Sequence, residues 1–68
     1  MNEETFNMSV RKFLKKLGIT AQRELEQRIR EAVASGRLTG REELPVKARV
    51  ALPEVGLDLE VEGRIALE

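Results

Sequence analysis

The stretch LKKLGITAQRELE, residues 14–26, decides whether the first half of this chain forms one helix or two. A basic segment ends at Gly18, and Thr20 precedes a charged segment with helical spacing. Glycine often ends a helix because it adopts left-handed backbone angles without strain, and threonine is a good N-cap. The pattern therefore predicts a helix over residues 3–17, a short turn, and a second helix over residues 21–35.

Each predicted helix carries an apolar stripe at intervals of three or four residues. The first stripe consists of Phe6, Val10, Phe13, Leu14 and Leu17. The second consists of Ala21, Leu25, Ile29, Ala32 and Val33. Asn2 or Thr5 can cap the first helix, and Gly36 can end the second. We expect the helices to form a hairpin with both stripes in a common core.

The hydrophobic period changes from 3.6 to 2 in the second half of the chain. Apolar and polar residues alternate over residues 46–52 and again over residues 57–67, which predicts two strands. Between them lies the segment PEVG, residues 53–56, with proline and glycine where a four-residue hairpin loop can use them.

The two strands agree on one antiparallel register, in which Leu52 lies opposite Leu57. On the polar side this register pairs Arg49 with Glu60, and Lys47 with Glu62. Opposite charges across a strand pair help to select the register. The predicted fold class is α+β, a two-helix hairpin followed by an antiparallel β-hairpin (ααββ), in one small domain of residues 1–68.

The residue composition argues against an enzyme. The chain has no histidine to activate Ser9 or Ser35, no cysteine, and no glycine-rich phosphate loop. Three carboxylates on one strand face could bind a divalent ion: Asp58, Glu60 and Glu62. Pairing with Lys47 and Arg49 of the other predicted strand is a simpler explanation for these carboxylates. We expect no enzymatic activity, no cofactor and no metal site.

The small size of the chain favours self-association. A domain of 68 residues buries only about 60% of its unfolded surface, and such domains often need a disulfide, a metal or a partner chain. The chain has no cysteine for a disulfide and no cysteine or histidine for a zinc site, so a partner chain is the remaining source of stability. We expect a small interaction or accessory module that forms a homodimer or binds another protein.

Charge is distributed unevenly along the chain, although the formal net charge is zero. Residues 5–41 carry nine basic and three acidic side chains, whereas residues 42–68 carry three basic and seven acidic ones. The densest cations are the candidate partner-binding residues: Arg11, Lys12, Lys15 and Lys16. They can contact phosphates or an acidic partner, or simply form the solvated face of a helix near its C-terminus.

A helix-turn-helix that reads DNA is not supported by residues 14–26. Leu14 stands where the two helices need a small residue, and Glu24 and Gln27 stand where the recognition helix needs apolar ones. Weak nucleic-acid binding by the basic helix face is therefore the alternative function, and a protein partner is preferred.

Four segments together resemble a family of small, uncharacterised bacterial proteins of about this length: MNEETFNMS, RKFLKKLGITAQRELE, REAVASGRL and EGRIALE. The resemblance implies a bacterial, stand-alone, cytosolic protein with no assigned activity, and it supplies no catalytic or binding residues. No apolar run approaches the roughly 20 residues that span a bilayer, and the acidic start is unlike a signal peptide. We expect a cytoplasmic protein that does not bind membranes.

Overall fold

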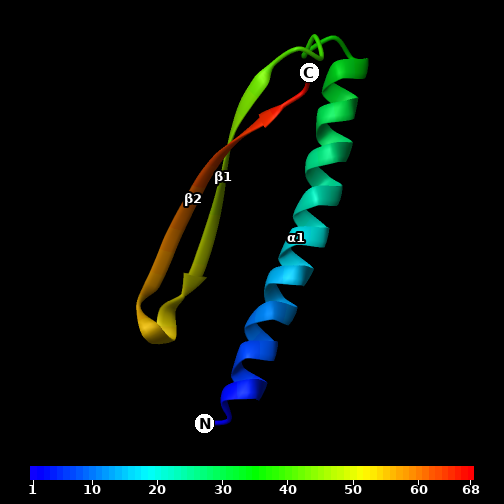
Figure 1. The fold of residues 1–68 in the computed structure, drawn as a ribbon. Coiled ribbons are helices and arrows are strands. Elements are labelled where there is room, and N and C mark those ends of the chain that lie inside the picture. The colour runs from blue at the N-terminus through cyan, green and yellow to red at the C-terminus, as the bar shows by residue number, and fades with distance from the viewer. The chain divides into compact units, whose positions relative to one another are not determined.

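The computed structural model of the protein describes residues 1–68 and contains one helix and one β-hairpin (Figure 1). The helix α1 spans Glu3–Ala34. Strand β1 spans Glu43–Leu52, the short 3-10 helix η1 spans Pro53–Val55, and strand β2 spans Leu57–Ala66. The chain divides into two compact units, residues 1–37 and residues 38–68. The α+β class is confirmed.

The predicted two-helix hairpin is wrong, because α1 continues without a break through Gly18 and Thr20 (Figure 1). Positive φ angles occur at three other glycines, Gly36, Gly40 and Gly56, and not at Gly18. A glycine inside a helix costs about 1 kcal/mol relative to alanine. A break at this point would instead leave four amide and four carbonyl groups without helical partners. The strong helix formers on both sides favour continuation.

Both ends of α1 follow the capping pattern of the sequence. The Asn2 side chain accepts a hydrogen bond from the Thr5 amide at 3.0 Å, which confirms Asn2 as the N-cap. The helix ends at Ala34, one residue before the predicted end, and Ser35 is the C-cap. Gly36 then adopts a φ of 82°, so its predicted role as the stop is confirmed.

The predicted β-hairpin and its register are confirmed, with Leu52 paired to Leu57. Strand β1 begins three residues before the predicted start, at Glu43, and includes Pro45. Proline is tolerated because each strand of a two-stranded sheet is an edge strand. Strand β2 ends at Ala66 rather than Leu67, although the Leu67 amide still donates to the Glu42 carbonyl at 2.9 Å.

The cross-strand ion pairs are diagonal rather than directly opposite. Arg49 Nε lies 2.8 Å from Asp58 Oδ1, and a second bond of 2.8 Å joins its Nη2 to Oδ2. Arg64 Nε lies 2.7 Å from Glu43 Oε1. Arg49 lies directly opposite its predicted partner Glu60, but its ion pair is with Asp58. The long Arg49 side chain reaches this diagonal neighbour, where its guanidinium makes two hydrogen bonds to the carboxylate.

No side chain of the chain is buried. A single helix exposes its whole circumference, and a two-stranded sheet has two open faces, so neither unit encloses a core by its own geometry. Each unit nevertheless separates apolar from polar residues on opposite faces. These faces are the candidate partner-binding surfaces of the protein.

Candidate partner-binding surfaces

The first surface is the apolar face of α1, here named the helix stripe. It contains the residues of both predicted stripes: Phe6, Val10, Phe13, Leu14, Leu17, Ala21, Leu25, Ile29, Ala32 and Val33. Because α1 is one helix, these residues form one surface along it instead of two facing ones. Large side chains on it remain open, with Phe13 53% exposed and Leu14 51% exposed.

The second surface is one face of the hairpin, here named the sheet face. Strand pairing places the alternate residues of both strands on it: Leu44, Val46, Ala48, Val50, Leu52, Leu57, Leu59, Val61 and Ile65. The opposite face carries the charged residues and the two cross-strand ion pairs. The hairpin is thus apolar on one side and charged on the other, as expected of a sheet that packs through one face.

The predicted cation cluster, Arg11, Lys12, Lys15 and Lys16, lies on α1 with every side chain exposed. None of these cations forms an ion pair, and residues 5–23 contain no acidic side chain. Three of them line a shallow hollow on the helix surface together with Met8, which is 69% exposed. Their charges are therefore free to meet an external anion.

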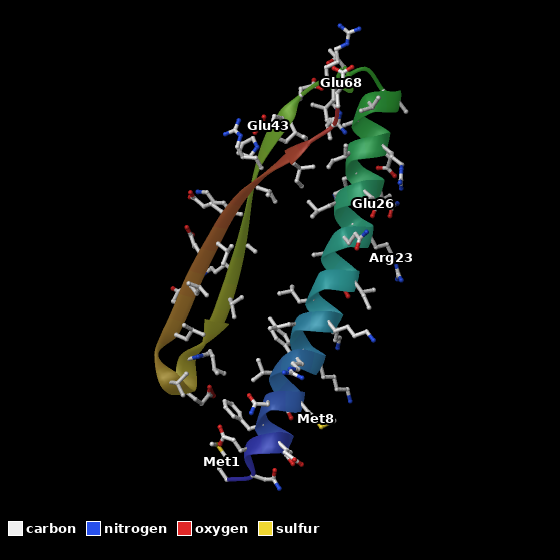
Figure 2. All side chains as sticks on the ribbon, viewed as in Figure 1. Met1, Met8, Arg23, Glu26, Glu43 and Glu68 are labelled. Atoms are coloured by element: carbon white, nitrogen blue, oxygen red, sulfur yellow. The ribbon has the colours of Figure 1, made fainter.

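Farther along α1, charges of both signs compensate one another. Arg28 lies 3.3 Å from Glu24, and Arg30 lies 3.0 Å from Glu26, which confirms both predicted pairs across one helical turn. Hydrogen bonds from Gln22 and then Arg30 lower the pKa of Glu26. Figure 2 shows Glu26 and Met8 projecting from the same side of α1. This charge-balanced end of α1 offers less attraction to an anion than the cation cluster does.

One carboxylate organises the segment that precedes β1. Glu42 accepts backbone amide hydrogen bonds from Thr39 at 2.8 Å, Gly40 at 2.9 Å and Arg41 at 3.1 Å. The Thr39 amide contributes most to lowering the pKa of Glu42, to about 2. The sequence analysis missed this role, although a Thr-Gly pair shortly before an acidic residue is the kind of turn signal that could have shown it.

We expect the Glu42 carboxyl to titrate near pH 2 in the folded protein, below its ordinary value of 4.5. A lowered folded pKa means that ionised Glu42 stabilises the fold above pH 4.5, and that this stabilisation fades as the pH falls from 4.5 to about 2. NMR titration of the side-chain carboxyl carbons measures the pKa directly.

Glu42→Gln should remove that part of the acid dependence of the melting temperature. Glu54→Gln is the matched control, because no hydrogen bond to the Glu54 carboxylate is present, and it should retain the wild-type acid dependence. A Glu42 titration midpoint at the ordinary value would contradict the amide contacts.

The remaining carboxylates do not assemble a metal site. No group of three or more acidic side chains lies close enough together to hold a metal ion. Asp58, one of the three strand carboxylates considered from the sequence, is engaged by Arg49. Nor does any helix combine the length and apolarity needed to cross a membrane.

Comparison with known proteins identifies a family. No match was found among the curated proteins or among the solved structures. The model of a family of unknown function, DUF6494, matches residues 1–68, which is the whole of the sequence and agrees with the resemblance to a small uncharacterised family. The chain therefore belongs to the family of unknown function DUF6494.

Proposed function

We propose that this protein is a small non-enzymatic interaction module that works as a self-associated pair of chains. The observation that carries the proposal is that each of the two units has an extended apolar face, the helix stripe or the sheet face, and that neither unit encloses a core by its own geometry. Apolar surface left in water costs about 25 cal/mol for each Å² that could be buried. Contact with a second chain removes that cost.

The chemistry of the side chains supports a binding role rather than catalysis. The chain has no histidine and no cysteine, so the usual general base and the usual sulfur nucleophile are missing. The one strongly shifted carboxyl, Glu42, is held by backbone amides of its own segment. Such a group orders a turn, and its lowered pKa is the opposite of what a general acid requires.

Sedimentation velocity and light scattering from low to high micromolar protein test the self-association. We expect a species of twice 7.7 kDa, with a melting temperature that rises with protein concentration, because mass action favours the associated state. A single 7.7 kDa species with one melting temperature at every concentration would refute the proposal.

Weak nucleic-acid binding is the second candidate function, and the unpaired cation cluster on α1 favours it. Replacing Lys12, Lys15 and Lys16 by glutamate should abolish binding to duplex DNA at low salt and leave the melting temperature unchanged. The affinity of the wild type should fall with salt concentration, because phosphate contacts release counterions.

The matched control reverses three exposed cations outside the cluster, Arg37, Arg41 and Lys47, and so makes the same change in net charge. If this control loses binding equally, the attraction is a property of total charge and not of the cluster. If the wild type binds no DNA at high micromolar protein and low salt, the second candidate is wrong.

A further inference from the structure

We infer that two copies of the chain join through the free edges of their β2 strands, which run antiparallel with Gly63 of each copy at a two-fold axis. This inference rests on the proposed self-association. It adds the element that joins the copies, the register of the two strands and the residue at the axis.

The hydrogen bonds of the hairpin decide which backbone groups of β2 point away from β1. In an antiparallel pair, residues that exchange hydrogen bonds alternate with residues whose amide and carbonyl point outward. The Leu67 amide donates to the Glu42 carbonyl at 2.9 Å, and these two residues continue the register of the strands. The bonded positions of β2 are therefore its odd-numbered residues, and the outward positions are Asp58, Glu60, Glu62, Arg64 and Ala66.

The two free edges of the hairpin differ in their ability to pair. The outward positions of β1 include Pro45, which has no amide hydrogen to donate, and Lys47. Proline and lysine on an edge strand oppose pairing with another chain. Strand β2 contains neither residue, so all of its outward positions keep their amides. The edge of β2 is therefore the one that can extend the sheet.

No other element of the same chain can pair with this edge as a strand. The sheet consists of β1 and β2, and the amides and carbonyls of α1 bond to one another along the helix. Any apolar partner can cover an apolar surface, but a row of backbone donors and acceptors is satisfied by water or by another strand. A strand that pairs with this edge therefore comes from a second chain.

Gly63 is a glycine that the hairpin itself does not require. Its φ is not positive, the strand register passes through it without interruption, and an added Cβ would meet only Val46 Cγ1, at an ordinary 3.7 Å. A glycine inside a strand weakens it and often marks a bulge or the close approach of another backbone. The uninterrupted register excludes a bulge, so a close approach is the explanation that remains.

A two-fold axis at Gly63 places this glycine where the two copies come closest. The two glycines then form a pair without mutual hydrogen bonds, and in such pairs the Cα atoms lie only about 4.5 Å apart. The same axis sets Glu62 of each copy directly opposite Arg64 of the other copy. Arg64 contacts Glu43 of its own chain only through Nε, at 2.7 Å, so its two terminal amino groups remain available for this second carboxylate.

The neighbouring registers bring like charges together. An axis at Glu62 would set the two copies of Glu62 against each other, and an axis at Val61 would set Glu60 against Glu62. With the axis at Gly63, Glu60 lies opposite Ala66 and no like charges meet. The edge of β2 is therefore complementary to itself when reversed, as a two-fold interface requires.

Pairing also corrects the weakness of each hairpin. A two-stranded sheet is marginal in water, whereas three or more strands with an apolar face are stable. Residues directly opposite one another lie on the same side of a sheet, so the axis at Gly63 keeps the odd-numbered residues of both β2 strands together. The sheet faces of the two copies then form one continuous apolar face.

Gly63→Cys tests the position of the axis. The chain has no cysteine, so the variant has one thiol in each copy. In the inferred dimer the two thiols face each other, and a Cα distance of about 4.5 Å lies within the range of a disulfide. We expect mild oxidation to produce a covalent dimer of twice 7.7 kDa, seen by denaturing electrophoresis without reductant.

Val61→Cys is the matched control. Val61 lies on the same face of β2, two residues from Gly63, and would be about 14 Å from its counterpart in the other copy. This distance is too long for a disulfide, so cross-linking should be about tenfold slower or more at the same protein and oxidant concentrations.

Glu62→Arg tests the edge without a cysteine. It sets like charges opposite each other at two places in the dimer, so the dissociation constant should rise about tenfold or more. Glu60→Arg makes the same change of charge on the same strand face but lies opposite Ala66, so it should change the dissociation constant less than about threefold. Sedimentation velocity compares the two variants.

The outcomes separate this inference from the proposed function. A wild type that is monomeric at every concentration overturns both. A dimeric wild type overturns only the pairing through β2 if Gly63→Cys cross-links no faster than Val61→Cys, or if Glu60→Arg weakens the dimer as much as Glu62→Arg. Fast cross-linking at residue 63, together with a selective loss of the dimer in Glu62→Arg, supports the inference.

Discussion

Ala21→Pro is expected to lower the stability of the protein by about 3 kcal/mol and to reduce the helical signal in circular dichroism. Ala21 lies well inside α1. Proline there removes the amide that donates to the carbonyl four residues earlier, and its ring clashes with that carbonyl. The variant separates the two architectures, because in a two-helix hairpin capped by Thr20 the same position would be the first helical residue, where proline is favoured.

Glu3→Pro is the matched control for this experiment. Glu3 is the first residue of α1 after the Asn2 cap, so its amide has no helical acceptor and proline should be nearly neutral. Thermal unfolding followed at a helical wavelength compares the two variants at equal protein concentration. Equal tolerance of proline at positions 3 and 21 would mean that the helix is interrupted between Gly18 and Ala21.

Leu59→Lys is expected to cost about 2–3 kcal/mol of stability and to weaken the association of the chains. Leu59 lies on the sheet face, paired with Val50, and is 46% exposed in the single chain. The large effect follows if the sheet face is covered in the associated protein, because a lysine there must be desolvated or must disrupt the contact. Urea unfolding at fixed protein concentration measures the loss.

Ala51→Lys is the matched control, because Ala51 is exposed on the opposite face of the hairpin, lies opposite Asp58, and undergoes the same change in charge. A lysine at this solvated position should change the stability by no more than about 0.5 kcal/mol. If Leu59→Lys is as mild as Ala51→Lys, the sheet face is open to water in the working protein, and of the two apolar faces only the helix stripe takes part in association.

The ends of α1 and the pairing of the strands were predictable because local chemistry specifies them. The N-cap role of Asn2 needs only a hydrogen bond within the first turn, and its side chain accepts that bond from the Thr5 amide at 3.0 Å. The strand register was predictable because shifting it by one residue would turn Leu52 and Leu57 to the charged face. The sequence also identified the cation cluster, and in the structure all of its side chains are exposed on α1.

The error at Gly18 has a physical cause. Gly18 with Thr20 two positions later is equally compatible with a helix end and with an interrupted apolar pattern inside one helix, since both residues have low helix propensity and good capping ability. The two outcomes differ by the eight backbone groups that a break would leave unpaired. The helix propensities and capping preferences of single residues do not include the cost of leaving those backbone groups without helical partners.

The sequence by itself determined the α+β class, the caps at the two outer ends of α1, the strand register and the division of each unit into an apolar and a charged face. Those features depend on neighbours within a few residues or on the two-residue period of a strand. Only the tertiary structure decided that α1 is continuous, that Arg49 reaches Asp58, and that the amides from Thr39 to Arg41 converge on Glu42. Each of these depends on which donor meets which acceptor in three dimensions. Several partners are compatible with the residue types alone, and the geometry of the folded backbone selects among them.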